Sequence, residues 1–196
     1  MYTLPTSVTT SNGRTFEITN KGDYRVILRC FQALNDDELG EDDKVLASLL
    51  TFYNEFKEFD DVISVGKEDI KELTSAMFKF FNCNQIQDVG CNTNKKLIDW
   101  ESDEHIIAAA INNVAHTEIR SLDYLHWFTF MGYYLSIGDS VLSTVVGIRN
   151  KIMSGKKLED YEKKFRNDNP QYFVWDCQTQ EDKEFNDYVK SLWNSQ

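Results

Sequence analysis

The sequence predicts a mainly α-helical protein, a single helical bundle of about six to seven helices with an N-terminal β-hairpin. Its 196 residues are a usual length for one domain, and 41% of them are hydrophobic. Aromatic residues make up 13% and only two residues are proline, so large apolar side chains are plentiful and helix breakers are few. From residue 23 onward, apolar residues recur every three to four positions, which is the period of a helix that buries one face.

The first regular element that we expect is a β-hairpin over residues 7–18. Its sequence, SVTTSNGRTFEI, alternates polar and apolar residues around Asn12 and Gly13. An Asn-Gly pair readily takes the positive φ angles of a tight primed turn. Because an isolated hairpin is only marginally stable in water, we expect it to lie on a helix or to pair with another strand.

Helices follow, separated by breaks that are rich in acidic residues, Asn or Gly. Asp23 is the expected N-cap of the first helix, and Glu41 opens an acidic turn that suits the dipole of the second. Either Ser102 or Asp103 is the expected cap of the fourth helix. Further expected stops and caps are Gly138, Asp139 or Ser140, and Gly155. Apolar stripes place helices at about residues 24–34, 45–56, 67–81, 103–114, 119–136, 141–152 and 158–165, with a last one following Thr179.

The expected organisation is a single domain with no internal repeat or flexible linker. It comprises the hairpin at residues 1–20, the helical bundle at 21–166, and a C-terminal helical tail at 167–196 that packs on the bundle or extends from it. Residues 82–96 contain Gly90 and four Asn and are expected to form a loop.

The net charge limits the classes of partner. The chain has 21 basic and 32 acidic residues, which gives a formal charge of −11. Such a chain repels phosphate backbones and anionic headgroups, so we expect neither nucleic acid nor a membrane as its partner. The most apolar run, residues 124–135, has 12 residues and is shorter than the ~18–20 that a membrane helix needs. No basic segment followed by an apolar one marks a signal peptide at the N-terminus.

The residue types used in catalysis and metal binding are present but are not clustered. The four cysteines lack the spacing of zinc ligands and are expected to be free thiols of a reducing cytoplasm. His105 and His116 would lie ~16 Å apart along one helix, and His126 is expected to be buried and bonded to a backbone or carboxylate group. Acidic runs are expected to be solvated turns or helix caps. We therefore expect no enzymatic activity, no cofactor and no metal.

Two segments are candidates for binding another protein. The aromatic run would surround a helix on all sides, so it either fills the core or forms part of a binding surface. Residues 148–166 hold seven basic and three acidic residues, which suits either docking on an acidic protein or a solvated helix face. The candidate partner-binding residues are Tyr124, Trp127, Phe128, Met131, Tyr134, Arg149, Lys156 and Lys157.

The order of these landmarks resembles a known family. FEITNKGDYRVILRCFQALNDDELGEDDKVLASLLTFYNEF is followed by LIDWESDEHIIAAAI, then by YLHWFTFMGYY and IRNKI. This order resembles the gp-fifteen-type proteins of tailed phages and prophages of Gram-positive bacteria, whose genes lie in the tail module just before the tape-measure gene. The resemblance covers about residues 5–166, and its most specific parts are Asp99 and the triplet Leu125-His126-Trp127. The family commonly has a second Trp where this chain has Phe128.

The resemblance implies a non-enzymatic tail-assembly chaperone or assembly factor. Such a protein would bind the tape-measure protein and keep its apolar helices soluble during tail assembly. It would act in the host bacterial cytoplasm and be absent from the mature virion, and another small tail-region protein is a further candidate partner. The alternative is a structural tail component that is retained in the virion.

Overall fold

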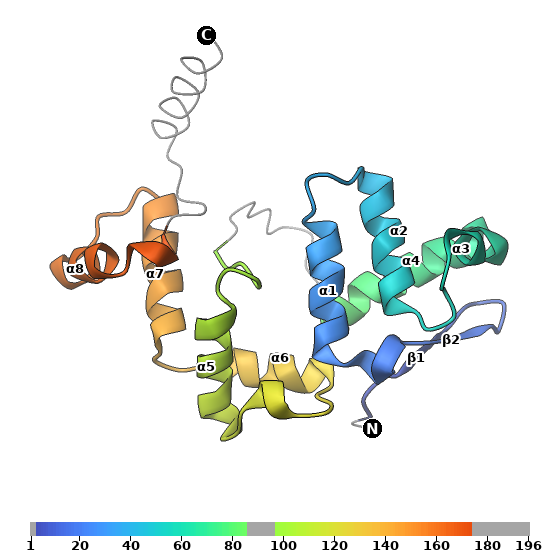
Figure 1. The fold of residues 1–196 in the computed structure, drawn as a ribbon, viewed down its shortest axis with the longest axis horizontal. Coiled ribbons are helices and arrows are strands. Elements are labelled where there is room, and N and C mark those ends of the chain that lie inside the picture. The colour runs from blue at the N-terminus through green and yellow to red at the C-terminus, as the bar shows by residue number, and fades with distance from the viewer. Residues whose placement is uncertain (1–2, 86–96, 174–196) are drawn as a thin grey trace, which may run out of the picture. The chain divides into compact units, whose positions relative to one another are not determined.

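The computed structural model describes residues 3–85 and 97–173 (Figure 1). These residues form eight α-helices, three short 3₁₀ helices and one antiparallel hairpin. The predicted mainly helical fold with an N-terminal hairpin is therefore confirmed. The last predicted helix, after Thr179, and most of the loop predicted at 82–96 lie outside the described residues.

The chain forms two compact units, which are described separately. The first contains residues 1–92 and 111–136, and the second contains residues 93–110 and 137–196. The elements of the first unit are β1 (Ser7–Thr9), β2 (Thr15–Glu17), η1 (Thr19–Gly22), α1 (Tyr24–Leu34), α2 (Glu41–Phe52), α3 (Phe59–Val65), α4 (Lys67–Phe81), η2 (Ile119–Ser121) and α6 (Trp127–Leu135). Those of the second unit are α7 (Val141–Met153), α8 (Asp160–Asp168) and η3 (Pro170–Tyr172), while α5 (Glu104–Ala115) contributes residues to both.

The hairpin lies on α4, as expected, but its turn differs from the predicted primed turn. Only Gly13 has a positive φ, of 84°, and its N–H donates to the carbonyl of Thr10 at 2.9 Å. Asn12 instead uses its side chain, because its amide donates to both carboxylate oxygens of Asp69 on α4 at 2.7 Å. A bond to the helix thus determines the turn type.

Several helix boundaries lie where the sequence places them. The side chain of Asp23 accepts a hydrogen bond from the first turn of α1, and the first turn of α2 is acidic. Ser140 and Ser143 form a reciprocal capping box at the start of α7. Gly155 follows the end of α7 with a φ of 64°, which is a left-handed conformation that ends helices. These signals are local and act within a few residues.

The helix predicted at 119–136 is shorter, since α6 begins at Trp127. The preceding residues pair instead with the start of α1. The N–H of Tyr24 donates to the Leu125 carbonyl at 2.9 Å, and the N–H of Leu125 donates to the Asp23 carboxylate at 2.9 Å. These bonds occupy backbone groups that a continuous helix would need. The prediction was wrong because a contact with a distant segment outweighs local helical preference.

A helix that periodicity did not predict is α3, which has only seven residues. Glu58 and Asp61 form a capping box at its start, and Val62 is its buried residue. Phe59 and Ile63, four residues apart on one face, are more than half exposed. A helix of two turns offers too few positions for an apolar period to be recognised.

The core of the first unit is rich in aromatic rings. Phe52 packs edge-to-face on Phe80 and Phe81, with centroids 5.3 and 5.6 Å apart. Trp127 is 1% exposed, stacks on Phe130, and donates its indole N–H to the carbonyl of Phe81 at 2.9 Å. Trp127 therefore belongs to the core. The buried apolar residues of the second unit are Ile106, Ile107, Ala108, Ala110, Leu142, Val145, Ile148 and Phe173.

Replacement of Trp127 tests this assignment. Trp127→Ala should lower the free energy of unfolding by ~3–5 kcal/mol, because it leaves a large cavity and an unpaired carbonyl. Urea denaturation followed by circular dichroism measures the change. Leu135→Ala, an exposed apolar position at the end of the same helix, is the control and should change stability by less than ~0.5 kcal/mol. Equal stability of the two variants would contradict the core assignment.

Candidate functional site

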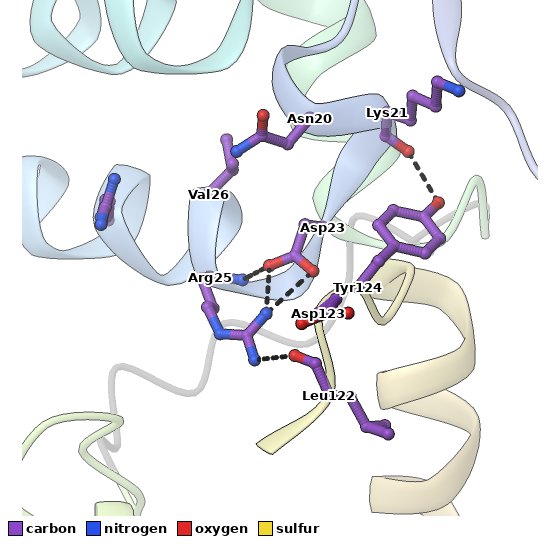
Figure 2. A pocket seen from close by; sticks show the side chains of 9 residues that line it. Asn20, Lys21, Asp23, Arg25, Val26, Leu122, Asp123 and Tyr124 are labelled. Atoms are coloured by element: carbon purple, nitrogen blue, oxygen red, sulfur yellow. Dashed lines mark hydrogen bonds and ion pairs between the residues drawn. The ribbon is translucent and has the colours of Figure 1, made fainter. Parts of the chain in front are cut away.

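A cleft in the first unit is the candidate site. It has a volume of about 660 Å³ and lies where the turn before α1 meets the extended segment before α6 (Figure 2). This segment belongs to the helix predicted at residues 119–136, but it is extended instead. The cleft is lined by Asn20, Lys21, Asp23, Arg25, Val26, Arg29, Leu122, Asp123 and Tyr124.

One rim of the cleft is a left-handed turn of three successive residues. Asn20, Lys21 and Gly22 have φ values of 47°, 54° and 79°, a conformation that costs about 1–2 kcal/mol for each residue with a side chain. The hydroxyl of Tyr124 donates to the Lys21 carbonyl at 3.1 Å and helps to hold the turn (Figure 2). A Cβ atom on Gly22 would lie 2.8 Å from the ring of Phe80. Glycine is therefore required at position 22 by its backbone and by its surroundings.

The Asp23 carboxylate joins the two sides of the cleft. It is 4% exposed and accepts hydrogen bonds from the N–H of Arg25 at 3.0 Å and from the N–H of Leu125 at 2.9 Å. The Arg25 guanidinium completes the cluster, with Nη1 at 3.1 Å from the carboxylate. One buried charge thus caps α1 and fixes the extended segment against it.

Arg25 forms a second bridge across the same junction. Its Nη2 donates to the carbonyl of Leu122 at 2.7 Å and to that of Arg120 at 3.2 Å, and its guanidinium lies 4.7 Å from the centre of the Tyr24 ring. Figure 2 shows this guanidinium between Asp23 and Leu122. Arg25 therefore acts mainly as a positioning residue. The exposed side chains that line the cleft are those of Asn20, Lys21, Arg29, Asp123 and Tyr124.

His126 is the N-cap residue of α6 and uses both ring nitrogens. Nδ1 accepts from the N–H of Phe128 at 3.0 Å, and Nε2 lies 3.0 Å from the carbonyl of Pro5, to which it donates. This pattern requires a neutral ring with its proton on Nε2. Burial lowers the pKa of His126, against the smaller opposing effects of the Pro5 carbonyl and Asp23. The expectation of a buried histidine bonded to the backbone is confirmed.

The predicted aromatic binding residues have different surroundings. Tyr124 is 44% exposed at the cleft, whereas Trp127 is buried. Phe128, Met131 and Tyr134 are half-buried along α6, and the ring of Phe128 packs on Phe80. Tyr124 is thus the most exposed member of this set.

The three predicted basic residues lie in the second unit. Lys156 and Lys157 are exposed after α7, but Arg149 is 2% exposed. Its guanidinium forms a two-pronged ion pair with Asp103, with Nη1 and Nη2 at 2.6 and 2.9 Å from the carboxylate oxygens. The expectation of Arg149 on a docking surface was wrong, because its charge is neutralised inside the unit.

Arg149 also joins segments that are distant in sequence. It donates to the Leu97 carbonyl at 3.0 Å and, through Nε, to the Tyr172 carbonyl at 2.9 Å. Asp103 directly precedes α5, where a cap was expected, but its carboxylate accepts from Arg149 and from the N–H of Asp99. A separate ion pair, between Lys151 and Glu162 at 2.7 Å, uses a further charge of the basic segment.

Residues 3–85 and 97–173 contain neither a cluster of metal ligands nor a membrane-spanning helix. Among these residues, no three His, Cys, Asp or Glu side chains are grouped so that they could hold a metal ion. No helix in the same ranges is both long and apolar enough to span a bilayer.

Comparison with known proteins gives one match. The model of the family described as bacteriophage Gp15 protein matches residues 3–172. No curated protein shows significant similarity to the chain, and no solved structure does either.

Removal of the Asp23 carboxylate tests its role at the junction. Asp23→Ala should lower the free energy of unfolding by roughly 2–4 kcal/mol, because a helix cap and a charged partner of Arg25 are lost together. Thermal and urea denaturation measure the effect. Asp123→Ala removes an exposed carboxylate from the same cleft and should change stability by less than ~0.5 kcal/mol. A similar loss in both variants would mean that Asp23 has no special role.

The state of His126 predicts a dependence of stability on pH. Its pKa is lowered from 6.5 in the folded protein, so unfolding takes up a proton in mildly acidic solution. The stability contributed by the neutral ring should be complete above pH ~6.5 and be lost as the pH falls through the lowered pKa. Urea denaturation at a series of pH values measures the slope. The control His116→Gln, at an exposed position, should keep this dependence of the free energy of unfolding on pH, whereas His126→Gln should abolish it. If the dependence persists in His126→Gln, it arises from other groups.

Proposed function

Because the chain belongs to the bacteriophage Gp15 protein family, we propose that it is a non-enzymatic tail-assembly factor. In this proposal it binds the tape-measure protein and keeps its apolar helices soluble until the tail tube forms around them. It works in the cytoplasm of the bacterial host and leaves the assembly before the virion is complete. Another small tail-region protein is a candidate second partner.

The observation that carries the proposal is the open Tyr124 ring beside the cleft. Tyr124 is 44% exposed, and its hydroxyl already donates to Lys21, so its ring face is what remains for a partner. Exposed tyrosines often anchor protein interfaces. The extended segment that carries Tyr124 is held by Asp23 and Arg25, which gives this ring a fixed position and lowers the entropic cost of binding.

The charge of the chain supports the same proposal. Long tape-measure helices expose apolar stripes and would aggregate before assembly. A partner that carries a formal charge of −11 would keep a complex with such helices dispersed by mutual repulsion. An apolar helix can bind in a groove of a helical protein through side chains spaced by three and four residues.

Co-expression tests the proposal directly. The tape-measure protein of the same phage or prophage should become more soluble when this chain is co-expressed, as measured by its soluble fraction after centrifugation. Tyr124→Ala should reduce that fraction several-fold. Tyr161→Ala removes a more exposed tyrosine, 67% exposed, from the second unit and should have no effect. No change in solubility with the unaltered chain would contradict the proposal.

Purified virions distinguish the assembly factor from its structural alternative. Quantitative mass spectrometry should find the chain absent from mature particles, or present far below the tail proteins. A fixed copy number per virion would instead identify a structural tail component and would overturn the proposed departure before completion.

A further inference from the structure

The two outer edges of the hairpin differ in whether their backbone groups are hydrogen-bonded. The edge of β2 is covered, because the N–H of Glu17 donates to the Glu55 carboxylate at 2.8 Å and the N–H of Asn54 donates to the Glu17 carbonyl at 2.9 Å. A further bridge joins Ile18 to Tyr53 just beyond the strand. The segment that follows α2 thus serves as a partial third strand on this side.

The edge of β1 is open. Val8 faces Phe16 across the hairpin, and the flanking pairs join Thr10 to Arg14 and Thr6 to Ile18. In an antiparallel ladder, the intervening residues, Ser7 and Thr9, direct their N–H and C=O groups away from the partner strand. No residue in 3–85 or 97–173 forms a hydrogen bond with these backbone groups. An open row of this kind is a template for pairing with another strand.

A groove lies beside this open edge. Its volume is about 340 Å³, and it is bounded by residues 8–10 of the hairpin and by one side of α4. The α4 side chains nearest the middle are small, Ser75 and Ala76, which leaves room for another backbone. Lys71, Glu72 and Lys79 flank them. The Glu72 carboxylate is occupied by the N–H and hydroxyl of Ser11, whereas the two lysines are exposed.

The hairpin runs alongside α4, which gives the groove a direction. Ser11 binds Glu72 near the start of α4, while Pro5, at the other end of the strand, binds His126, which packs on Phe80. A strand added to β1 would therefore follow α4. Lys71 and Lys79 are eight residues apart, or ~12 Å by helical rise, which is close to the ~13 Å between residues i and i+4 on one face of a strand.

We propose that the open edge of β1 binds an extended segment of a partner protein that carries acidic side chains four residues apart. Backbone hydrogen bonds to Ser7 and Thr9 would provide affinity, and Lys71 and Lys79 would select carboxylates. Lys79 is exposed and forms no ion pair with a described residue, and the Lys71–Glu68 pair is exposed on both sides and exchangeable. The proposal does not depend on the tape-measure protein.

Fluorescence anisotropy with a labelled TVEVTVEVT peptide tests the site. The unaltered chain should bind it saturably and should bind TVKVTVKVT at least tenfold more weakly. The acidic peptide with N-methyl groups on alternate backbone nitrogens should also bind at least tenfold more weakly, because it cannot form all the backbone hydrogen bonds with β1. Equal binding of all three peptides, or no binding of the first, would overturn the proposal.

Variants of the protein locate the binding. Thr9→Pro removes one of the open N–H groups and should weaken binding at least tenfold, with circular dichroism confirming that the helices remain. Lys79→Glu should weaken binding of the acidic peptide about fivefold or more and should strengthen binding of the lysine peptide. Lys164→Glu, an exposed position on α8, should change neither. Unchanged binding in both Thr9→Pro and Lys79→Glu would overturn the assignment.

A second copy of the chain is the competing occupant of this edge. Sedimentation measurements without peptide should show no self-association that depends on Thr9. A dimer that Thr9→Pro dissociates would show that β1 pairs with β1 of another copy, and it would overturn the proposal of an acidic partner.

Discussion

The buried carboxylate of Asp23 holds together two parts of the chain that are far apart in sequence. It caps α1 and also takes the N–H of Leu125, 102 positions further on. Because a charge removed from water needs several hydrogen-bond donors around it, the extended segment before α6 has a single favourable placement. The start of α6, the depth of Trp127 in the core and the rim of the cleft all follow from that placement. The left-handed turn before Asp23 is the conformational cost of this arrangement.

Two arginines of this acidic chain position its backbone. Arg25 binds two carbonyls beside the cleft, and Arg149 binds two carbonyls and a carboxylate in the second unit. A guanidinium suits this task because its donors spread in one plane and remain charged when buried. The cleft around Tyr124 and the open edge of β1 remain accessible to a partner.

Much of the fold could be predicted from sequence because its signals act over a few residues. Asp23, Ser140 and Gly155 begin or end helices through their immediate neighbours, and the hairpin follows from alternation. The parts that could not be predicted depend on contacts between distant residues. Burial of Arg149 depends on its ion pair with Asp103, 46 positions away. The sequence pattern of a helix does not distinguish a basic residue that is paired in the interior from one that is exposed. The cleft was missed for the same reason, since its two sides are joined by contacts between residues about 100 positions apart.

The ion pair between Asp103 and Arg149 has a consequence for the descent of this protein. Loss of either partner leaves the other as an isolated buried charge, which is far more harmful than replacing both together. Lineages that carry a neutral residue at one of these positions are therefore expected to have compensated at the other. Paired changes at these two positions would then mark related lineages in a way that a comparison of either position alone would miss.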